Sequence, residues 1–373
     1  MMNVLCHKGG IVMAACAVLS SLLLSCSKVQ FAEPRVEAPS ELSFDIDWSD
    51  VILDGPRRPD DMTVLMSKVK SVTRHYVWQV DSVGKVIVAN ESVAEVDKGE
   101  YMVAGLSSYI HEDYVVSDVD KFLSSDEVLM KDVYVEIPLL ENDEIEALDV
   151  LDFNPVSPYI RYVRPLYYVK PENNSLRNIP SENGVPLALK QFTCCLTFPV
   201  ILNVEDGVEI ESVRGVISGL PLRVYMLSGD VDGSRTGKAV FTMQQTQKDP
   251  QTGDMIYEGR VNAFGLLPPE DPKMSTGNGI LNVIISAKVE DGDRTFERVF
   301  NVTMNMKEKI TAAALMSIRD GKKECMRLEC KEYRFDIKNQ LKVTRKHVMS
   351  DAEGGFDIWE PEDGSVEGLN PEI

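Results

Sequence analysis

The sequence predicts a mainly β protein made of two tandem antiparallel β-sandwich domains with a few short helices. Runs of alternating apolar and polar residues recur at intervals of about 8 to 15 residues, with Gly, Pro, Asn and Asp between them, which is typical of sandwiches. Asp291-Gly292 between two such runs is the strongest hairpin signal in the chain. The length of 373 residues suits two domains of ordinary size better than one.

Strands in the first half are predicted where apolar residues alternate with polar ones. The predicted strands are 42–48, 62–69, 74–80, 86–88, 99–104 and 131–139, with extended chain through 159–168. Between them, residues 118–131 have the spacing of a short helix capped by Ser117 or Asp118. The acidic stretch 141–146 is expected to be solvated.

The second half repeats this pattern. Its predicted strands are 185–189, 192–202, 209–217, 222–227, 238–243, 255–264, 280–289 and 295–304, followed by a helix within 306–319. Pro180 and Gly184 flank polar residues and place a domain boundary near residue 180. The predicted organisation is therefore a signal peptide (1–25), a tether (26–41), an N-terminal domain (42–179), a C-terminal domain (180–350) and an acidic tail (351–373).

The first 25 residues are interpreted as a lipoprotein signal peptide. The apolar run 9–24 is shorter than the roughly 20 apolar residues that span a membrane, and it ends at Leu23-Leu24-Ser25-Cys26. Leu23 and Ser25 fit the lipobox pattern, whereas Leu24 departs from it because a small residue is commoner there. Cleavage between Ser25 and Cys26 followed by acylation of the Cys26 thiol is expected. An ordinary signal peptide or a retained anchor is the alternative.

The residue after the lipidated cysteine favours the outer membrane. An acidic residue there is the usual inner-membrane retention signal of enteric bacteria, and this chain has Ser27. Residues 27–41 are polar, contain Pro34 and Pro39, and cannot bury enough apolar surface to order themselves, so they form a flexible tether.

Charge and motif content argue against nucleic-acid binding and against catalysis. A formal net charge of −20 is unfavourable for phosphate contacts. His75, His111 and His347 are isolated in sequence, and no hydrolase or phosphate-binding motif occurs. Asp230-Val231-Asp232-Gly233 resembles part of a calcium loop, but Phe241 stands where the bidentate glutamate is needed, so a polar hairpin turn is predicted. We expect a non-enzyme without cofactor or metal.

Four cysteines remain in the predicted mature chain besides Cys26. Cys194 and Cys195 are adjacent, so on a strand their side chains point to opposite faces, and Cys325 and Cys330 also face oppositely if they share one strand. None has the spacing of a zinc site. One or two disulfides and buried thiols are both open readings of these residues.

Four tyrosines form a candidate sugar platform. Alternation places Tyr162 and Tyr168 on one side of an extended chain and Tyr159 and Tyr167 on the other, which favours packing inside a sandwich over a shared stacking surface.

Several short motifs, taken together and in order, resemble a known family. They are Phe44-Asp45-Ile46-Asp47-Trp48-Ser49, Gly99-Glu100-Tyr101, Val216-Ile217-Ser218-Gly219-Leu220, and Gly354-Gly355-Phe356 followed by Trp359. They cover most of the mature chain, and each is short. In this respect the chain resembles the FimB-type fimbrial anchor and accessory lipoproteins of Bacteroidales.

The resemblance implies two transthyretin-like β-sandwiches and attachment to the outer membrane through acylated Cys26. It also implies binding of fimbrial shaft or accessory subunits by β-strand addition. Shaft subunits of such fimbriae lose their first strand to an arginine-specific protease, whereas anchors keep their lipid. Arg161 and Arg164 lie late in the first domain, and no cleavage is assigned to them. Anchor, tip and shaft roles stay open, and a glycan-binding lipoprotein of a polysaccharide-uptake system is the alternative function.

The C-terminal tail repeats the aromatic pattern of the first predicted strand. Phe356-Asp357-Ile358-Trp359 echoes Phe44-Asp45-Ile46-Asp47-Trp48, which suggests that the tail donates or pairs as a strand. Coincidence, or packing of the tail on its own domain, is the alternative interpretation.

Overall fold

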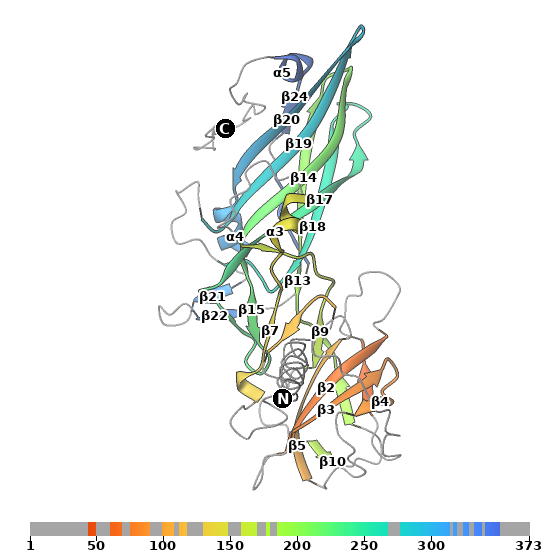
Figure 1. Cartoon of the computed structure of the whole chain (residues 1–373), viewed down its shortest axis with the longest axis vertical. Coiled ribbons are helices and arrows are strands. Elements are labelled where there is room, and N and C mark those ends of the chain that lie inside the picture. Colours follow the sequence, from red (N-terminus) through yellow and green to blue (C-terminus); the bar gives the residue numbers. More distant parts are fainter. Residues whose placement is uncertain are drawn as a thin grey trace, which may run out of the picture. The chain divides into compact units, whose positions relative to one another are not determined.

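The chain folds mainly into β-strands with a few short helices, as predicted (Figure 1). A computed structural model describes residues 44–49, 60–68, 75–89, 99–107, 112–117, 130–147, 158–169, 177–179, 185–267, 277–313, 316–318, 324–327, 332–337 and 340–350. Internal contacts divide the chain into Met1–Glu37 and Ala38–Ile373, and all described residues belong to the second unit. The transthyretin-like topology remains what the family resemblance implies.

A seven-stranded sheet forms the N-terminal part. Its strands are β2 (Asp61–Lys68), β3 (His75–Asp81), β4 (Val86–Ala89), β5 (Gly99–Ser107), β9 (Tyr167–Val169), β10 (Arg177–Ile179) and β12 (Lys190–Gln191). Their order is β12-β9-β5-β2-β3-β4, with β10 also beside β5. The predicted strands 62–69, 74–80, 86–88 and 99–104 are thereby confirmed.

A two-stranded parallel layer covers one face of this sheet. It consists of β1 (Phe44–Asp47) and β11 (Val185–Ala188). Phe44 and Trp48 pack with residues of β2, β3 and β5, including the fully buried Met62 and Tyr101. Alternation along each strand explains the layering, because every second side chain of β2 and β5 points towards this layer.

A nine-stranded sheet forms most of the C-terminal part. It contains β8 (Tyr159–Ile160), β13 (Cys194–Val204), β14 (Val208–Pro221), β17 (Thr236–Lys248), β18 (Met255–Ala263), β19 (Ile280–Asp291), β20 (Arg294–Asn305), β23 (Glu332–Arg334) and β24 (Gln340–Val343). The strand order is β20-β19-β14-β17-β18-β13-β23, with β24 also beside β13 and β8 beside β17. All eight predicted strands from 185 to 304 are found, and several extend further than predicted.

A third sheet has six strands from three regions of the chain. They are β6 (Val115–Val116), β7 (Tyr134–Glu136), β15 (Arg223–Tyr225), β16 (Asp230–Asp232), β21 (Met316–Ile318) and β22 (Glu324–Arg327), in the order β21-β22-β16-β15-β7-β6. Strands on both sides of residue 180 therefore pair with each other, as β1 does with β11. The predicted domain boundary there stays a prediction.

The helices are short and differ in part from the prediction. Within the described ranges they are the 3-10 turn η2 (Met130–Asp132) and the α-helices α3 (Asn142–Ala147), α4 (Lys307–Ala313) and α5 (Arg345–Met349). The helix predicted within 306–319 ends at Ala313, because residues 316–318 pair with β22 as β21. The acidic stretch 141–146 is mostly helical, and the Glu144 side chain accepts a hydrogen bond from the Glu141 amide at its start. The helix predicted at 118–131 lies almost wholly outside the described residues.

An aromatic stack fills the C-terminal core. The Phe198 ring stacks between Phe241, at 5.6 Å, and Phe335, at 5.3 Å between centroids. Phe241 lies flat on β14 and β18 because Gly215 and Gly259 carry no side chain beneath it, and a Cβ at either position would meet the ring at 2.3 Å. Glycine at these two positions therefore shapes the core rather than a turn.

The Ser218-Gly219 motif sits at a β-bulge near the end of β14. The register of β14 against β17 shifts between Ser218 and Leu220, and Gly219 has φ of 89°. The Ser218 hydroxyl donates to the Gly277 carbonyl at 2.7 Å and accepts from the Ile280 amide at 3.1 Å. This bulge ties the strand end to the start of β19, which gives the motif a structural role.

Candidate strand-docking site

The longest sheet edge that the structure describes is that of β20. Its 12 residues pair with β19 from Ile280↔Asn305 to Asp291↔Arg294. No other strand in the described part of the chain pairs with β20. An edge strand of this length presents a row of backbone donors and acceptors to which another strand can be added.

The two-residue loop between β19 and β20 fixes which backbone groups point outwards. Asp291 and Arg294 flank Gly292-Asp293, and such a closing pair exchanges both hydrogen bonds. Hydrogen-bonded and non-hydrogen-bonded pairs then alternate along the ladder. The amides and carbonyls of residues 295, 297, 299, 301 and 303 consequently point away from β19, towards the edge.

The side chains of β20 separate into a buried and an exposed row. Phe300, Val302 and Met304 are buried in the main core. The opposite row is exposed, and Val299 keeps 41% of its surface accessible, which makes it one of the few exposed large apolar residues. Exposed apolar surface next to outward-pointing backbone groups is what strand addition uses.

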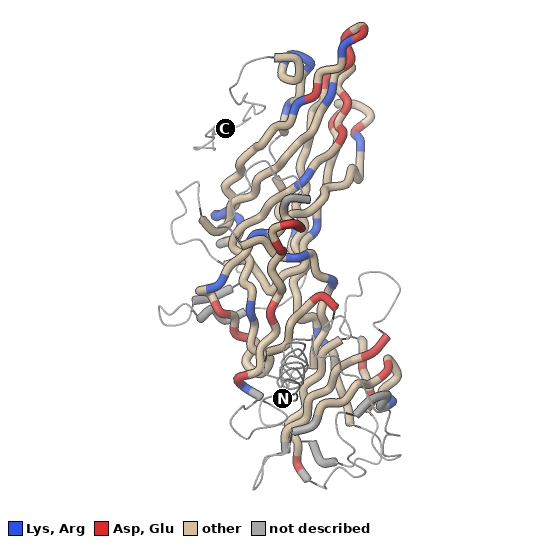
Figure 2. Tube along the Cα trace, in the orientation of Figure 1, with Lys and Arg blue, Asp and Glu red and all other residues tan. Residues whose placement is uncertain are grey.

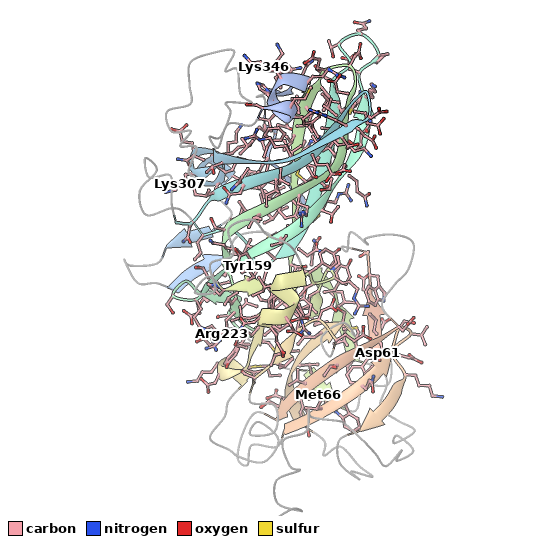
Figure 3. All side chains as sticks on the ribbon, turned by 45° about the horizontal axis from the view of Figure 1, so that its top comes forward. Asp61, Met66, Tyr159, Arg223, Lys307 and Lys346 are labelled. Atoms are coloured by element: carbon pink, nitrogen blue, oxygen red, sulfur yellow. The ribbon has the colours of Figure 1, made fainter. Side chains whose placement is uncertain are left out.

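Helix α5 lies against β19 and β20 near the hairpin end of this edge (Figure 1). Val348 is buried in the core, and the Arg345 guanidinium lies 3.5 Å from the Asp291 carboxylate. The Arg298 side chain of β20 donates a hydrogen bond to the Ser350 carbonyl. Figure 3 labels Lys346 in α5 and Lys307 at the start of α4, which follows directly after β20. The two helices therefore mark the two ends of the edge.

The strand nearest the predicted lipid attachment is built firmly into the N-terminal core. The Phe44 amide donates to the Gly84 carbonyl at 2.9 Å, and the Leu189 amide donates to the Asp47 carbonyl at 3.0 Å. Gly84 has φ of 93°, and a Cβ there would lie 1.6 Å from the Phe44 carbonyl oxygen. Phe44 and Trp48 are both buried. The chain emerging from the tether is thus fixed to the body at its first described residues.

The predicted cleavage and lipidation residues, Ser25 and Cys26, lie outside the described residues, as does the tether. They stay predictions. Among the residues that the structure describes, no helix is long and apolar enough to cross a membrane.

The two arginines considered for proteolytic processing are both held in ion pairs. The Arg164 guanidinium contacts the carboxylates of Asp113 and Glu112, which raises its pKa, and the Tyr114 hydroxyl donates to the Arg164 carbonyl. Burial raises the pKa of Tyr114 well above its ordinary value, and the Asp113 charge adds to this effect. A protease that binds an extended arginine side chain has to open these contacts first.

Arg161 is held in a similar way, but on a more exposed surface. Its guanidinium pairs with Glu144 of α3 at 3.0 Å, and its own amide donates to the Pro138 carbonyl. This pair also lowers the pKa of the Glu144 carboxyl, although the hydrogen bond from the Glu141 amide is the larger cause. Neither arginine is presented as an extended, unengaged side chain.

The tyrosine cluster does not form a shared sugar platform. Tyr159 and Tyr167 are buried, and Tyr168 packs on Phe192 at 4.3 Å between ring centroids. Tyr162 is 62% exposed. Tyr159, Tyr167 and Tyr168 therefore pack inside the protein, as predicted. The four rings do not share one surface on which a sugar could stack.

The partial calcium-loop motif belongs to a strand. Asp230–Asp232 form β16, with Val231 buried and paired to Val224, so the predicted turn begins only at Asp232. The Asp232 carboxylate accepts from the Ser234 amide at 3.0 Å, as in a tight turn. Within the described residues there is no cluster of three or more His, Cys, Asp or Glu residues arranged to hold a metal.

The cysteines follow the predicted alternation where their side chains are described. Cys194 is buried, and Cys195, on the opposite face of β13, is half-buried. Cys325 lies in β22, and Cys330 falls outside the described residues. The disulfide pairing of the four stays an open prediction.

Comparisons with known proteins find similarity among solved structures. No family model matches the chain, and no curated protein matches it. A candidate adhesin from Bacteroides ovatus has a TM-score of 0.42 at 12% identity, covering 85% of this chain and 98% of its own. The fimbrial anchor protein Mfa2 from Porphyromonas gingivalis has a TM-score of 0.36 at 9% identity, covering 81% and 89%. A candidate adhesin from Bacteroides thetaiotaomicron has a TM-score of 0.38 at 10% identity, covering 85% and 94%. Similarity at this level is distant and does not transfer a function to this chain.

Sequence reasoning missed the residues that shape the candidate site. The alternation in 295–304 predicted a strand, but not that β20 ends the sheet, because strand order depends on contacts between distant segments. The Gly84 contact with Phe44 was likewise missed. The glycine in the tight turn Asp81-Ser82-Val83-Gly84 was the available signal. Because a tight turn already accounts for a glycine, the sequence did not indicate that Gly84 also leaves room for Phe44.

Proposed function

We propose that this chain is an outer-membrane lipoprotein that acts as a fimbrial anchor or accessory subunit. In this proposal it binds fimbrial subunits by β-strand addition at the edge of β20 and carries out no catalysis. The observation that carries the proposal is the 12-residue β20, which pairs on one side only within the described chain and exposes Val299 beside that edge.

Strand addition satisfies the edge in two ways at once. A partner's extended segment supplies carbonyls and amides to the outward-pointing groups of residues 295 to 303, and its side chains cover the exposed Val299. Arg294 and Glu297 are exposed charges on the same strand. Charges on an edge strand oppose indiscriminate pairing, so they favour a partner with complementary charges.

The N-terminal part supports the anchor role over the shaft role. Between Cys26 and Phe44 lie only 17 residues, so a lipid on Cys26 holds the body close to the membrane surface. Removing β1 would expose Met62 and Tyr101, which Phe44 and Trp48 now help to bury. A subunit that keeps β1 and is not cut between Cys26 and Phe44 also keeps its lipid.

The edge is tested by replacing Val299 with proline. Val299→Pro removes an amide that points to the edge and leaves the ladder with β19 intact, since edge strands tolerate proline at such positions. We expect the affinity for a purified fimbrial shaft subunit to fall at least about tenfold, measured by surface plasmon resonance.

The matched control is Val299→Ile, which keeps the amide and an apolar β-branched side chain and should bind as the wild type does. Both variants should show the same near-ultraviolet circular dichroism spectrum. Equal affinity of the two variants would exclude the β20 edge as the binding site. Binding of an oligosaccharide without binding of any fimbrial subunit would favour the glycan-binding alternative.

A further inference from the structure

A segment from the first half of the chain is built into the nine-stranded sheet. We call it the strap, and it consists of the described runs 137–147, which contains α3, and 158–166, which contains β8. The two runs are hydrogen-bonded to each other, because the Leu140 amide donates to the Tyr159 carbonyl at 2.8 Å. The strap is therefore one paired unit.

The strap lies where β17 and β18 stop pairing with each other. The pairs between these strands end at Met243 of β17, although both strands continue. β8 runs beside the remaining part of β17, where the Lys238 amide donates to the Pro158 carbonyl at 2.8 Å. Further along the strap, the Asn262 side chain of β18 donates to the Val163 carbonyl at 3.0 Å. The strap therefore connects the two strands where they no longer contact each other through their backbones.

The inner side of the strap is packed into the main core. Ile160, Val163 and Leu166 are each at most 2% exposed. Gly237 of β17 leaves room for this packing, because a Cβ there would lie 2.5 Å from Ile160 Cγ2 and 2.8 Å from Leu222 Cδ2. Glycine weakens a strand and often marks a place where another segment approaches closely, as the strap does here.

The outer side of the strap packs on the opposite face of the same sheet. Ile145 of α3 and Tyr159, which Figure 3 labels, form a separate hydrophobic cluster with Val216 of β14 and Ile284 of β19. Acidic residues precede Ile145 in α3, appear in red in Figure 2, and are exposed or half-buried. The strap therefore holds the sheet from both faces.

The strap continues directly into the seven-stranded sheet. Leu166 is followed by β9, which pairs with β5. The Phe192 amide donates to the Leu166 carbonyl at 2.7 Å, and the Leu166 amide donates to the Thr193 hydroxyl at 3.0 Å. Phe192 and Thr193 connect β12 of the seven-stranded sheet to β13 of the nine-stranded sheet. Two chain segments that run from one sheet to the other are thus hydrogen-bonded to each other.

From these contacts we propose that the strap is a clamp that makes the seven-stranded and nine-stranded sheets open and unfold as one cooperative unit. Unfolding of the seven-stranded sheet has to displace β9, and β9 is continuous with strap residues that are buried in the core of the other sheet. In the proposed function the clamp passes tension from the lipid-anchored end to a subunit bound at β20. This consequence rests on the proposed function, whereas the clamp itself does not.

Native-state hydrogen exchange of the full chain in detergent, with stepwise addition of urea, tests the clamp. Val302→Ala leaves a cavity beneath β20, which two strands separate from β17, and it destabilises the nine-stranded sheet. We expect the slowest amides of β14 to exchange at least about tenfold faster in this variant. With the clamp in place, the slowest amides of β5 should accelerate by the same factor.

Opening the strap should remove this coupling. Gly237→Ala pushes β8 away from β17, and in this background Val302→Ala should accelerate β14 while leaving β5 unchanged. Ile145→Ala weakens the outer contact and should reduce the coupling in the same direction. Gly253→Ala is the matched control, because nothing lies within 4 Å of its Cβ position, and it should leave the two sheets coupled.

Two outcomes would overturn the clamp. One is that Val302→Ala alone accelerates β14 without β5, and the other is that both sheets still accelerate equally in the Gly237→Ala background. If Gly237→Ala does not fold, the same comparison in Ile145→Ala decides between coupled and independent sheets. None of these measurements needs a partner. Coupled exchange in a chain that binds no fimbrial shaft subunit would uphold the clamp and reject the proposed function.

Discussion

Gly84 is the residue on which the seating of the first strand depends. The β3–β4 turn brings it directly under Phe44, and its φ of 93° is one that a residue with a side chain rarely adopts. Its carbonyl also accepts a hydrogen bond from the Phe44 amide, which ties the start of β1 to this turn. One glycine therefore serves the turn and the strand together.

We expect Gly84→Ala to displace β1. The new Cβ would lie 1.6 Å from the Phe44 carbonyl oxygen, so β1 has to move, and the burial of Phe44 is lost. The free energy of unfolding should fall by about 2 to 4 kcal/mol, measured by urea denaturation.

Gly253→Ala is the matched control. Gly253 also has a positive φ, of 77°, but nothing lies within 4 Å of the position of its Cβ. The Gly253→Ala substitution should lower the free energy of unfolding by only about 1 kcal/mol, from backbone strain alone. If the two substitutions cost the same, the contact with Phe44 contributes nothing to the seating of β1.

Individual residues were predictable where the reason is local. The opposite facing of Cys194 and Cys195 follows from the alternation of a strand, and the structure confirms it. The glycines beneath Phe241 were not predictable, because Gly215 and Gly259 come from two other strands and meet the ring only in the folded sheet.

At the scale of elements, apolar alternation found strands because it reports burial on one face. It therefore underestimated strands that continue beyond the core. The predicted strand 238–243 extends as β17 to Lys248, where most side chains are exposed and polar and the pattern vanishes. Conversely, the apolar residues in 314–318 suited a helix, but pairing with β22 makes 316–318 a strand. Tertiary pairing overrides local preference in both cases.

Helix α5 is the element whose stability should depend on pH. Thr344 and His347 form a reciprocal capping box at its start, in which the Thr344 amide donates to His347 Nδ1 at 3.3 Å. Burial lowers the pKa of His347, and the charge of Lys346 also lowers it, while the Lys342 carbonyl and Glu205 act in the opposite direction. The neutral imidazole is the form that accepts the hydrogen bond.

Because the folded pKa lies below the unfolded value near 6.5, the contribution of this cap is present above about pH 6.5 and is lost as the pH falls through the folded pKa. Amide exchange in α5 should therefore accelerate relative to that in β14 between about pH 7 and pH 5. His347→Gln keeps an acceptor at the same position without a titrating group and should remove this difference. An unchanged pH dependence in His347→Gln would show that another group is responsible.

The whole molecule depends on pairings between segments that are far apart in sequence. β7 pairs with β15, and β8 runs parallel to β17, so residues of the first half complete sheets of the second. The mainly β class followed from the sequence because it needs only local pattern. The strand order did not, since it depends on which edges meet after the chain has folded. The position of β20 at a sheet edge is part of the strand order and therefore could not be predicted from local pattern.

At this scale the proposed function needs three parts: the predicted lipid on Cys26, a folded body in which β1 packs on Gly84, and the proposed strand-accepting edge of β20. The lipid and the edge act together only if a bound fimbrial subunit is held at the membrane through this chain.

Fractionation of cells that produce either the wild type or Cys26→Ala tests most directly whether this chain holds fimbrial subunits at the membrane. Immunoblots of the membrane and soluble fractions follow both this chain and the fimbrial shaft subunit. The account predicts that both are in the outer-membrane fraction of the wild type and that both leave it in Cys26→Ala. A Cys26→Ala chain that stays in the membrane fraction, or fimbrial subunits that stay attached after the chain is released, would contradict it.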